Sequence, residues 1–324
     1  MTTVLQIFFI TFPFFALVLC GFAAARRRLL PLEAVTGLNS FVLFFALPCM
    51  LYRFGASTPL AQLLDVGVLV TWLLCALITV GFAVAVSLGK RIGWNDAAFG
   101  ALVAAFPNTG FMGVPLLVAL LGPRAAGPLI LTMLIDMVIT TSLCIGLSRL
   151  DGAGAQGAGK AAKNALRAAA ANPLAWSILL GAAASAISLE LPKPVMQVVG
   201  MLADAASPVA LFTIGAVLAR SQMTALAKSH APIPLQDYLP AAAIKLLVHP
   251  LLVLAIGVSA IRFGLPLQPF VLLVLVLAAA LPSASNVSLL AERFGADNGR
   301  IARIILVSTA AAFVSFSLLA AWLT

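Results

Sequence analysis

The sequence predicts an all-α membrane protein of ten transmembrane helices in two inverted five-helix repeats, with broken, crossing fourth and ninth helices. Three observations support this prediction: the apolar composition, ten long hydrophobic segments, and prolines and glycines that recur at a fixed spacing. Of the 324 residues, 63% are hydrophobic and 9% are charged, whereas a soluble globular chain has about 25% charged residues. The composition therefore excludes a soluble globular protein.

Ten apolar segments are long enough to cross a bilayer as helices, which takes roughly 20 residues. They exceed the roughly 9–11 residues of a membrane β-strand, so we expect the backbone hydrogen bonds within helices rather than in a barrel. In chain order, the expected spans one to ten are Val4–Ala24, Glu33–Arg53, Asp65–Leu88, Asp96–Leu121, Gly127–Ser148, Pro173–Leu189, Met196–Ala219, Pro240–Ile261, Pro269–Ala291 and Ala302–Leu323.

Landmark residues of the first half recur in the second half. The offsets are 160, 160, 161 and 160 residues for Pro13 and Pro173, Gly21 and Gly181, Pro31 and Pro192, and Pro48 and Pro208. Each half contains five spans, an odd number, so two copies must cross the bilayer in opposite orientations. Inverted repeats of this kind surround the midplane site of many carriers. We therefore expect a first repeat at residues 1–148, a cytoplasmic linker at 149–172 and a second repeat at 173–324.

Basic residues are concentrated in alternate loops. If the N-terminus lies outside, the odd-numbered loops hold 14 Lys and Arg residues and the even-numbered loops hold 4. This asymmetry follows the positive-inside rule and predicts that both termini lie outside. The net charge of +9 therefore reflects topology, and we expect no nucleic-acid partner. Met1–Gln6 lacks a positively charged leader region, so we expect the first span to be retained.

Motifs for nucleotides and metals are incomplete. Gly154–Lys160 fits the first seven positions of a phosphate-binding loop, but Ala161 stands where Ser or Thr is required, and no strand precedes the segment. The four cysteines all lie in apolar segments, where packing explains them better than disulfides or zinc. We therefore expect no cofactor and no metal site.

Two expected spans, the fourth and the ninth, are interrupted by a proline that polar residues follow. A proline inside a helix removes a backbone hydrogen bond, and in hydrocarbon the freed groups must face protein or a water-filled cavity. Two breaks at matching places in an inverted repeat predict two half-helices that cross at the midplane. The residues are Pro107, Asn108 and Thr109 in the fourth span and Pro282, Ser283, Ser285 and Asn286 in the ninth.

The expected crossing favours an anion. A half-helix that begins after a break exposes free N–H groups and the positive end of its dipole. The Asn and Ser side chains add uncharged donors, so a carboxylate could bind reversibly without a full positive charge. The alternative is that Pro107 and Pro282 are ordinary kinks, which the matching pair of polar clusters disfavours.

Four ionisable residues fall within expected spans, where each costs about 2.5–3.5 kcal/mol at the helix centre. They are Asp136, Asp204, Lys245 and His249. Lys245 and His249 are four residues apart and share a helix face. These residues could neutralise one another as structural ion pairs, or they could attract substrate and couple ions. The sequence does not determine which aspartate is the partner of Lys245.

Four motifs together resemble a known family over essentially the whole chain. They are PNTGFMGVPLL (Pro107–Leu117), NPLAWSILLG (Asn172–Gly181), SPVALFTIGAVLA (Ser207–Ala219) and LPSASNVSLLAERFGAD (Leu281–Asp297). On these motifs the chain resembles the auxin efflux carrier family of bacterial and plant transporters, whose bacterial members include proteins described as malonate carriers.

The resemblance implies that the helices form two domains with different roles. Helices one, two, six and seven would form a scaffold that mediates homodimerisation, and helices three to five and eight to ten would form a mobile, elevator-like transport domain. Pro107 and Asn108 match the crossover Pro-Asn that receives a carboxylate, and Pro282 and Asn286 match the second crossover. The long central loop of the plant members is absent and the residues after Pro282 differ from the plant pattern; both departures argue against auxin itself.

Together these inferences predict a secondary transporter that moves a small organic anion, a mono- or dicarboxylate that is malonate-like or auxin-like. We expect it in the bacterial inner membrane, as a homodimer. The alternative is an intramembrane enzyme or a sensor built on a transporter-like bundle. No His-Glu-x-x-His or Gly-x-Ser-x-Gly motif occurs, so we expect no catalytic residues.

The charge asymmetry makes a testable prediction about topology. A cysteine introduced as Lys160→Cys should react only with reagents that reach the cytoplasm, and one introduced as Arg124→Cys should react from outside, because the two loops lie on opposite sides of the expected bilayer. Labelling in sealed cells measures both accessibilities. Modification of Lys160→Cys by an impermeant reagent would overturn the orientation.

Overall fold

The computed structural model describes residues 4–57, 65–150, 173–227 and 233–324, and within these ranges all named elements are helices. Most of the expected linker, including Lys160, lies outside the described residues. In chain order the elements are α1 (Val4–Arg26), α2 (Ala34–Phe41), η1 (Val42–Ala46), α3 (Leu47–Ser57), α5 (Val66–Ser87), α6 (Trp94–Ala105), η2 (Thr109–Gly113), α7 (Val114–Leu121), η3 (Pro123–Ala125), α8 (Ala126–Ile135), η4 (Asp136–Thr140), α9 (Thr141–Leu147), α11 (Pro173–Ala186), α12 (Lys193–Ala227), η5 (Leu235–Asp237), α13 (Leu239–Ala243), η6 (Ile244–Val248), α14 (His249–Arg262), α15 (Pro269–Ala279), α16 (Val287–Arg293) and α17 (Asn298–Leu323).

Within the described residues, seven helical segments are long and apolar enough to cross a membrane, which confirms the prediction of an all-α membrane protein. They correspond to expected spans one, two, three, five, seven, eight and ten. Expected spans four and nine are each divided into two helices, and α11, which corresponds to span six, has 14 residues. The arrangement of ten spans in inverted repeats stays a prediction.

Two helix pairs pack with their backbones in close contact, and glycines make this possible. A Cβ atom added to Gly21 of α1 would lie 1.8 Å from the carbonyl oxygen of Phe212 in α12, and one added to Gly215 of α12 would lie 1.8 Å from the carbonyl oxygen of Val18. Such small-residue contacts let helices approach closely in membranes. α1 is therefore fixed against α12.

The second pair repeats the contact. A Cβ atom added to Gly55 of α3 would lie 2.6 Å from the carbonyl oxygen of Ile178 in α11, and one added to Gly181 would lie 2.3 Å from that of Tyr52. Gly21 and Gly181 are 160 residues apart, and Gly55 and Gly215 are also 160 residues apart. The same helix contact thus occurs twice at the spacing seen in the sequence.

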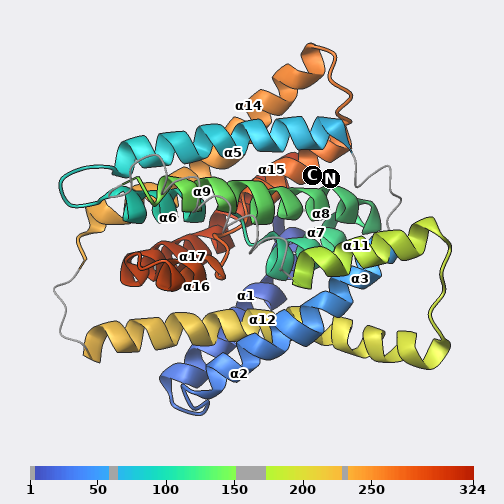
Figure 1. Cartoon of the computed structure of the whole chain (residues 1–324), viewed down its shortest axis with the longest axis horizontal. Helices are drawn as coiled ribbons and strands as arrows, with labels where there is room; N and C mark the ends of the chain where they lie inside the picture. The colour runs from blue at the N-terminus through green and yellow to red at the C-terminus, as the bar shows by residue number, and fades with distance from the viewer. Residues whose placement is uncertain (1–3, 58–64, 151–172, 228–232) are drawn as a thin grey trace.

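The helices divide into two groups. The first helix group comprises α1, α2, η1, α3, α11 and α12, and the second comprises the elements from α5 to α9 and from α13 to α17; each group packs mainly within itself. In Figure 1, α1, α2, α3 and α12 occupy the lower part of the view, and α5, α8, α9, α14 and α15 the upper part. The groups meet where α1 contacts α7 and α17, and where α12 contacts η2 and α17.

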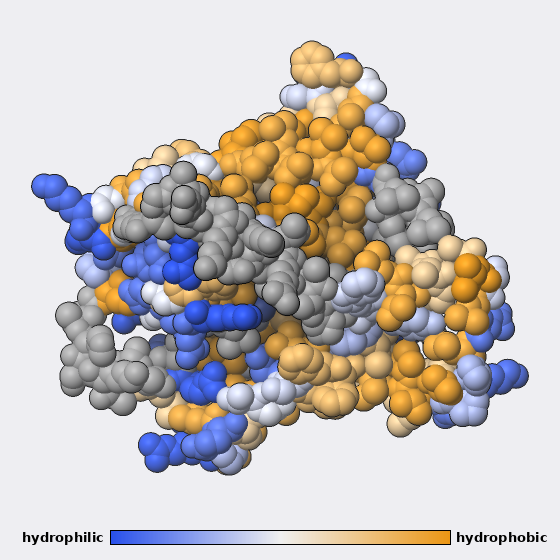
Figure 2. Space-filling view, in the orientation of Figure 1, coloured by the Kyte–Doolittle hydropathy of each residue, from blue (hydrophilic) through white to orange (hydrophobic). Residues whose placement is uncertain are grey.

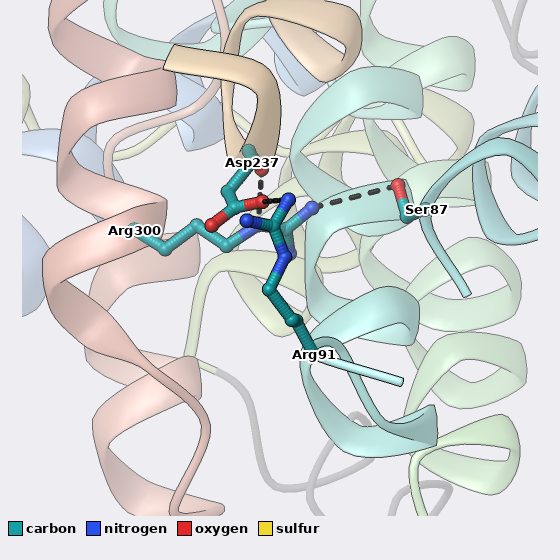
Figure 3. A network of polar contacts seen from close by, with 4 residues as sticks. All are labelled: Ser87, Arg91, Asp237 and Arg300. Carbon is teal, nitrogen blue, oxygen red and sulfur yellow. Dashed lines mark hydrogen bonds and ion pairs between the residues drawn. The ribbon is translucent and has the colours of Figure 1, made fainter. Parts of the chain in front are cut away.

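A buried arginine joins several chain segments at one end of the second helix group. Arg300 is 3% exposed, and its guanidinium donates to the carbonyl oxygens of Asp237 and Asp96 and, at 3.5 Å, to the hydroxyl of Ser87. Arg91 pairs with the carboxylate of Asp237 at 2.8 Å (Figure 3). This network fixes the ends of α5, α6 and α17 relative to the segment that precedes α13.

The outer surface is suited to lipid. In Figure 2, hydrophobic residues cover the upper middle and much of the lower right of the visible face, and hydrophilic residues gather mainly on its left side and at its right edge. Large apolar side chains are exposed along the outer helices, including Phe9 on α1, Leu251 on α14 and Trp322 on α17. A soluble protein rarely exposes so much contiguous apolar surface.

The close glycine contacts predict a specific sensitivity to substitution. Gly215→Ala places a methyl group against backbone that cannot rotate away, and overpacking of this kind costs about 1–3 kcal/mol. We expect a lower melting temperature of the purified protein in thermal unfolding. Gly81→Ala in α5 is the matched control, because nothing lies within 4 Å of the added Cβ atom. A wild-type melting temperature for Gly215→Ala would contradict the close α1–α12 contact.

Candidate functional site

The two interrupted helices meet at their breaks. The backbone N–H of Asn108 donates to the carbonyl oxygen of Pro282 at 2.8 Å, and the N–H of Ala284 donates to the carbonyl oxygen of Phe106 at 3.0 Å. Pro107 and Ser283 thereby form an antiparallel bridge. The breaks of the expected fourth and ninth spans therefore lie against each other, and we call this place the crossover.

Four helix ends surround the crossover. α6 ends at Ala105 and η2 begins at Thr109, while α15 ends at Ala279 and α16 begins at Val287. Proline has no N–H and cannot continue the helical hydrogen bonds, so each chain becomes extended at its break. Because exposed backbone groups are costly in hydrocarbon, the two extended segments satisfy each other. The crossover therefore combines two N-terminal and two C-terminal helix ends.

Asn108 occupies the N-cap position of η2 without capping it. An Asn at this position normally accepts a hydrogen bond from one of the first N–H groups of the helix, but no such bond is present. The N–H groups of Gly110 and Phe111 have no acceptor among the described residues. The residue Asn108 is 4% exposed. Its amide and the start of η2 therefore offer hydrogen-bond donors that no described residue uses.

Three further polar atoms at the crossover are buried without a partner among the described residues. They are Thr109 Oγ1, Ser283 Oγ and Asn286 Oδ1. A buried polar atom left unpaired costs about 1–3 kcal/mol, and most such atoms in native proteins are satisfied. A group of them in one place indicates a site for a polar ligand or water. Ser285, which is partly exposed, lies in the turn between Ser283 and α16.

A second polar cluster lies beside the crossover in the second helix group. Lys245 of η6 is fully buried; its Nζ donates to the carbonyl oxygen of Ala279 at 2.7 Å and contacts Nδ1 of His249 at 3.1 Å. Asp136 of η4 is also fully buried and accepts a hydrogen bond from Thr140 at 2.9 Å. Asp136 and Lys245 interact electrostatically, although no direct ion pair joins them.

The structure does not bring Asp204 into this cluster. Its carboxylate pairs with Arg53 of α3 at 2.7 Å, and 71% of its side chain is exposed. The sequence correctly placed Asp204 in an apolar helix, but its face of α12 turns outward. Sequence reasoning also missed two contacts: that of Arg53, the last residue of the second expected span, and that of Trp72, which packs against His249 at 5.4 Å between ring centroids. Only helix packing reveals either contact.

Broken helices that meet inside an apolar helical bundle, among polar groups that no described residue uses, are typical of membrane transporters. Comparison with known proteins agrees with this class. Residues 1–320 match the family described as "Membrane transport protein". The chain therefore belongs to this auxin efflux carrier-like family of membrane transport proteins, and it is a transporter rather than an enzyme.

Individual relatives cover most of the chain. A protein of Rhizobium meliloti (strain 1021) named "Putative malonate transporter" is 30% identical over 302 residues, which is 92% of this chain and 89% of that protein. The "Uncharacterized transporter YfdV" of Escherichia coli (strain K12) is 27% identical over 288 residues, 87% of this chain and 86% of that protein. The protein of the same name from Shigella flexneri gives the same values.

The crossover geometry predicts the effect of changing Asn108. A hydrogen bond to a charged group contributes about 1.5–3 kcal/mol, so Asn108→Ala should weaken anion binding by roughly 10–150-fold. Asn108→Asp should bind more weakly still, because it opposes an anion with a negative charge. Asn286→Ala should have a smaller effect, since Ser283 and Ser285 are nearby donors. Binding of a carboxylate panel to purified variants measures these changes.

The control for this prediction is a measurement that each variant folds as the wild type does. The purified variants should elute and melt as the wild type does, because the lost amide makes no hydrogen bond to a described residue. Wild-type affinity in both Asn108→Ala and Asn108→Asp would mean that the anion binds elsewhere and that the breaks serve only packing.

Proposed function

We propose that the protein is a secondary transporter that moves a small organic anion, a mono- or dicarboxylate, across the bacterial inner membrane. The observation that carries the proposal is the crossover. There the amide of Asn108 and the N–H groups of Gly110 and Phe111 are donors that no described residue uses, beside buried polar atoms that have no partner in the same part of the chain. Pro107 and Pro282 create the site by ending α6 and α15, and Thr109, Ser283, Ser285 and Asn286 supply polar groups around it.

The charge of the site suits an anion. The start of η2 carries a partial positive charge, and the N–H groups of Gly110 and Phe111 there have no acceptor among the described residues. Helix starts of this kind are common sites for carboxylates. The donors at the crossover are uncharged amides, hydroxyls and backbone groups. Such a site holds an anion without forming an ion pair and can release it on the other side, as a carrier requires.

Two sets of donors favour a short dicarboxylate. The bridge joins Pro107 to Ser283. Asn108 directly follows Pro107 in the first interrupted helix, and Asn286 comes three residues after Ser283 in the second. One carboxylate can bind at the start of η2 while the second meets Asn286 and Ser285. Malonate has this form, and it is the substrate in the printed name of the relative from Rhizobium meliloti.

Alternating access follows from the two helix groups. We assign the first helix group as a scaffold, because its backbones are in contact at Gly21, Gly55, Gly181 and Gly215, and we assign it the surface that pairs two copies. The second helix group contains the crossover and moves as an elevator-like transport domain. The expected first repeat (1–148), linker (149–172) and second repeat (173–324) supply both groups.

Counterflow in proteoliposomes tests the function. The purified protein, reconstituted with malonate inside, should accumulate labelled malonate from outside, because a carrier exchanges substrate without net driving force. Protein-free liposomes and Asn108→Asp proteoliposomes are the controls, and both should show little exchange. If neither malonate nor any member of a panel of mono- and dicarboxylates exchanges, the proposed function is wrong.

A further inference from the structure

Lys245 holds the C-terminal end of a half-helix at the crossover. Its Nζ donates to the carbonyl oxygen of Ala279, the last residue of α15, at 2.7 Å. Pro282 follows three residues later. The C-terminal end of a helix carries a partial negative charge, and in many carriers such ends of broken helices coordinate the coupling Na⁺ or H⁺. Here a fully buried lysine ammonium lies at that position.

The neighbours of Lys245 include a histidine with an unused ring nitrogen. The Nζ of Lys245 and Nδ1 of His249 are 3.1 Å apart; when Lys245 is protonated it can only donate, so Nδ1 then accepts. The other nitrogen, Nε2, is buried and has no partner among the described residues. Trp72 packs against the ring and acts on Asp136 as a hydrogen-bonding neighbour, although its buried Nε1 makes no well-aligned hydrogen bond to a described residue.

Asp136 supplies the opposing charge. One carboxylate oxygen, Oδ1, accepts from Thr140, while Oδ2 is buried and unpaired among the described residues. Asp136 acts electrostatically on Lys245, yet no ion pair within 4.0 Å joins them. Arg53 and Asp204 are in direct contact at 2.7 Å, whereas Asp136 and Lys245 are not. The nearest polar influences on the carboxylate of Asp136 are the side chains of Thr140 and Trp72.

The groups that face the cluster come from several elements. η4 contributes Asp136, η6 contributes Lys245, α14 contributes His249 and α9 contributes the thiol of Cys144, which interacts with Asp136. α5 contributes the neutral Trp72, and α15 contributes a backbone carbonyl group. With Asp136 and Lys245 both ionised, the cluster is neutral. Adding or removing one proton leaves one uncompensated buried charge, which is costly.

We propose that Asp136, Lys245 and His249 form a proton-binding site that couples H⁺ movement to substrate movement at the crossover. The ammonium of Lys245 takes the place of a metal cation at the end of α15. A proton that binds Asp136 from one side of the membrane removes the negative charge opposite Lys245. The electrostatic attraction between Lys245 and Asp136 is then lost, while the hydrogen bond from Lys245 to the carbonyl oxygen of Ala279 remains. The end of α15 transmits this change to Pro282 and Asn286. The proton is released to the other side.

This proposal rests on the proposed function and makes it more specific. It predicts that a pH gradient drives transport and that Na⁺ does not. The test uses the full-length protein in proteoliposomes, with labelled malonate as the probe. External pH is held constant so that the ionisation of external malonate does not change, and internal pH or internal Na⁺ is varied. Net malonate accumulation should follow the pH gradient and should be unaffected by a Na⁺ gradient.

Variants test the residues. Asp136→Asn is nearly isosteric and cannot exchange a proton, so it should keep malonate counterflow but lose the accumulation driven by a pH gradient. Asp204→Asn is the matched control, because it removes a carboxylate from the exposed pair with Arg53, and it should keep the wild-type pH response. A full pH response in Asp136→Asn would overturn the proposal.

Lys245 requires a paired design because its loss leaves a buried carboxylate uncompensated. Lys245→Met alone should reduce folded yield, and Lys245→Met combined with Asp136→Asn should restore it, since both buried charges are then removed. The double variant should show no pH-driven accumulation. If Asp136→Asn does not restore the folded yield of Lys245→Met, the two residues do not compensate each other's charge, and the shared site is wrong.

The outcomes distinguish this inference from the proposed function. If the wild-type protein exchanges no carboxylate, the proposed function fails. If it exchanges malonate but net accumulation ignores the pH gradient, or follows the Na⁺ gradient, the function stands and the proton site is wrong.

Discussion

The structure depends on how backbone groups are satisfied where two helices are interrupted. Pro107 and Pro282 free N–H and carbonyl groups that hydrocarbon cannot solvate. The bonds from Asn108 to Pro282 and from Ala284 to Phe106 satisfy some of these groups, but only because the two breaks lie against each other. That requirement fixes α6, α7, α15 and α16 relative to one another. It also leaves the N–H groups of Gly110 and Phe111 without an acceptor among the described residues, and these are donors that the proposed site uses.

The two helix groups are held together by different physics. In the first, glycines bring backbones into contact, and close packing is the means of association available between helices in an apolar solvent. In the second, buried polar groups bind to backbone carbonyls: Arg300 joins the ends of α5, α6 and α17, and Lys245 joins η6 to α15. These hydrogen bonds hold the elements of the second helix group together, as the proposed motion of that group as one body past the first helix group requires.

The ionisable residues of the expected spans differ in burial and in pairing. Arg53 and Asp204 form a short, exposed pair, which contributes little to stability. Asp136 and Lys245 are buried without a direct bond between them, although buried charges are normally closely paired. A charge kept in this costly arrangement is a candidate for function by default. Of the two explanations that the sequence left open, pairing fits Asp204, whose partner is Arg53, and coupling by Asp136 and Lys245 stays our proposal.

The sequence by itself determined the class of protein and the positions of the breaks. Apolar segments of sufficient length dictate membrane helices, and a proline followed by Asn108 or Ser283 dictates an interruption, because these are local properties of the chain. It also gave the 160-residue spacing that relates Gly21 to Gly181. Only the tertiary structure decided that Gly21 lies against Phe212, that Asp136 and not Asp204 acts on Lys245, and that Lys245 binds the end of α15. These facts depend on which face each helix turns toward its neighbours, and a helix that is apolar on all sides does not encode that choice in its own periodicity.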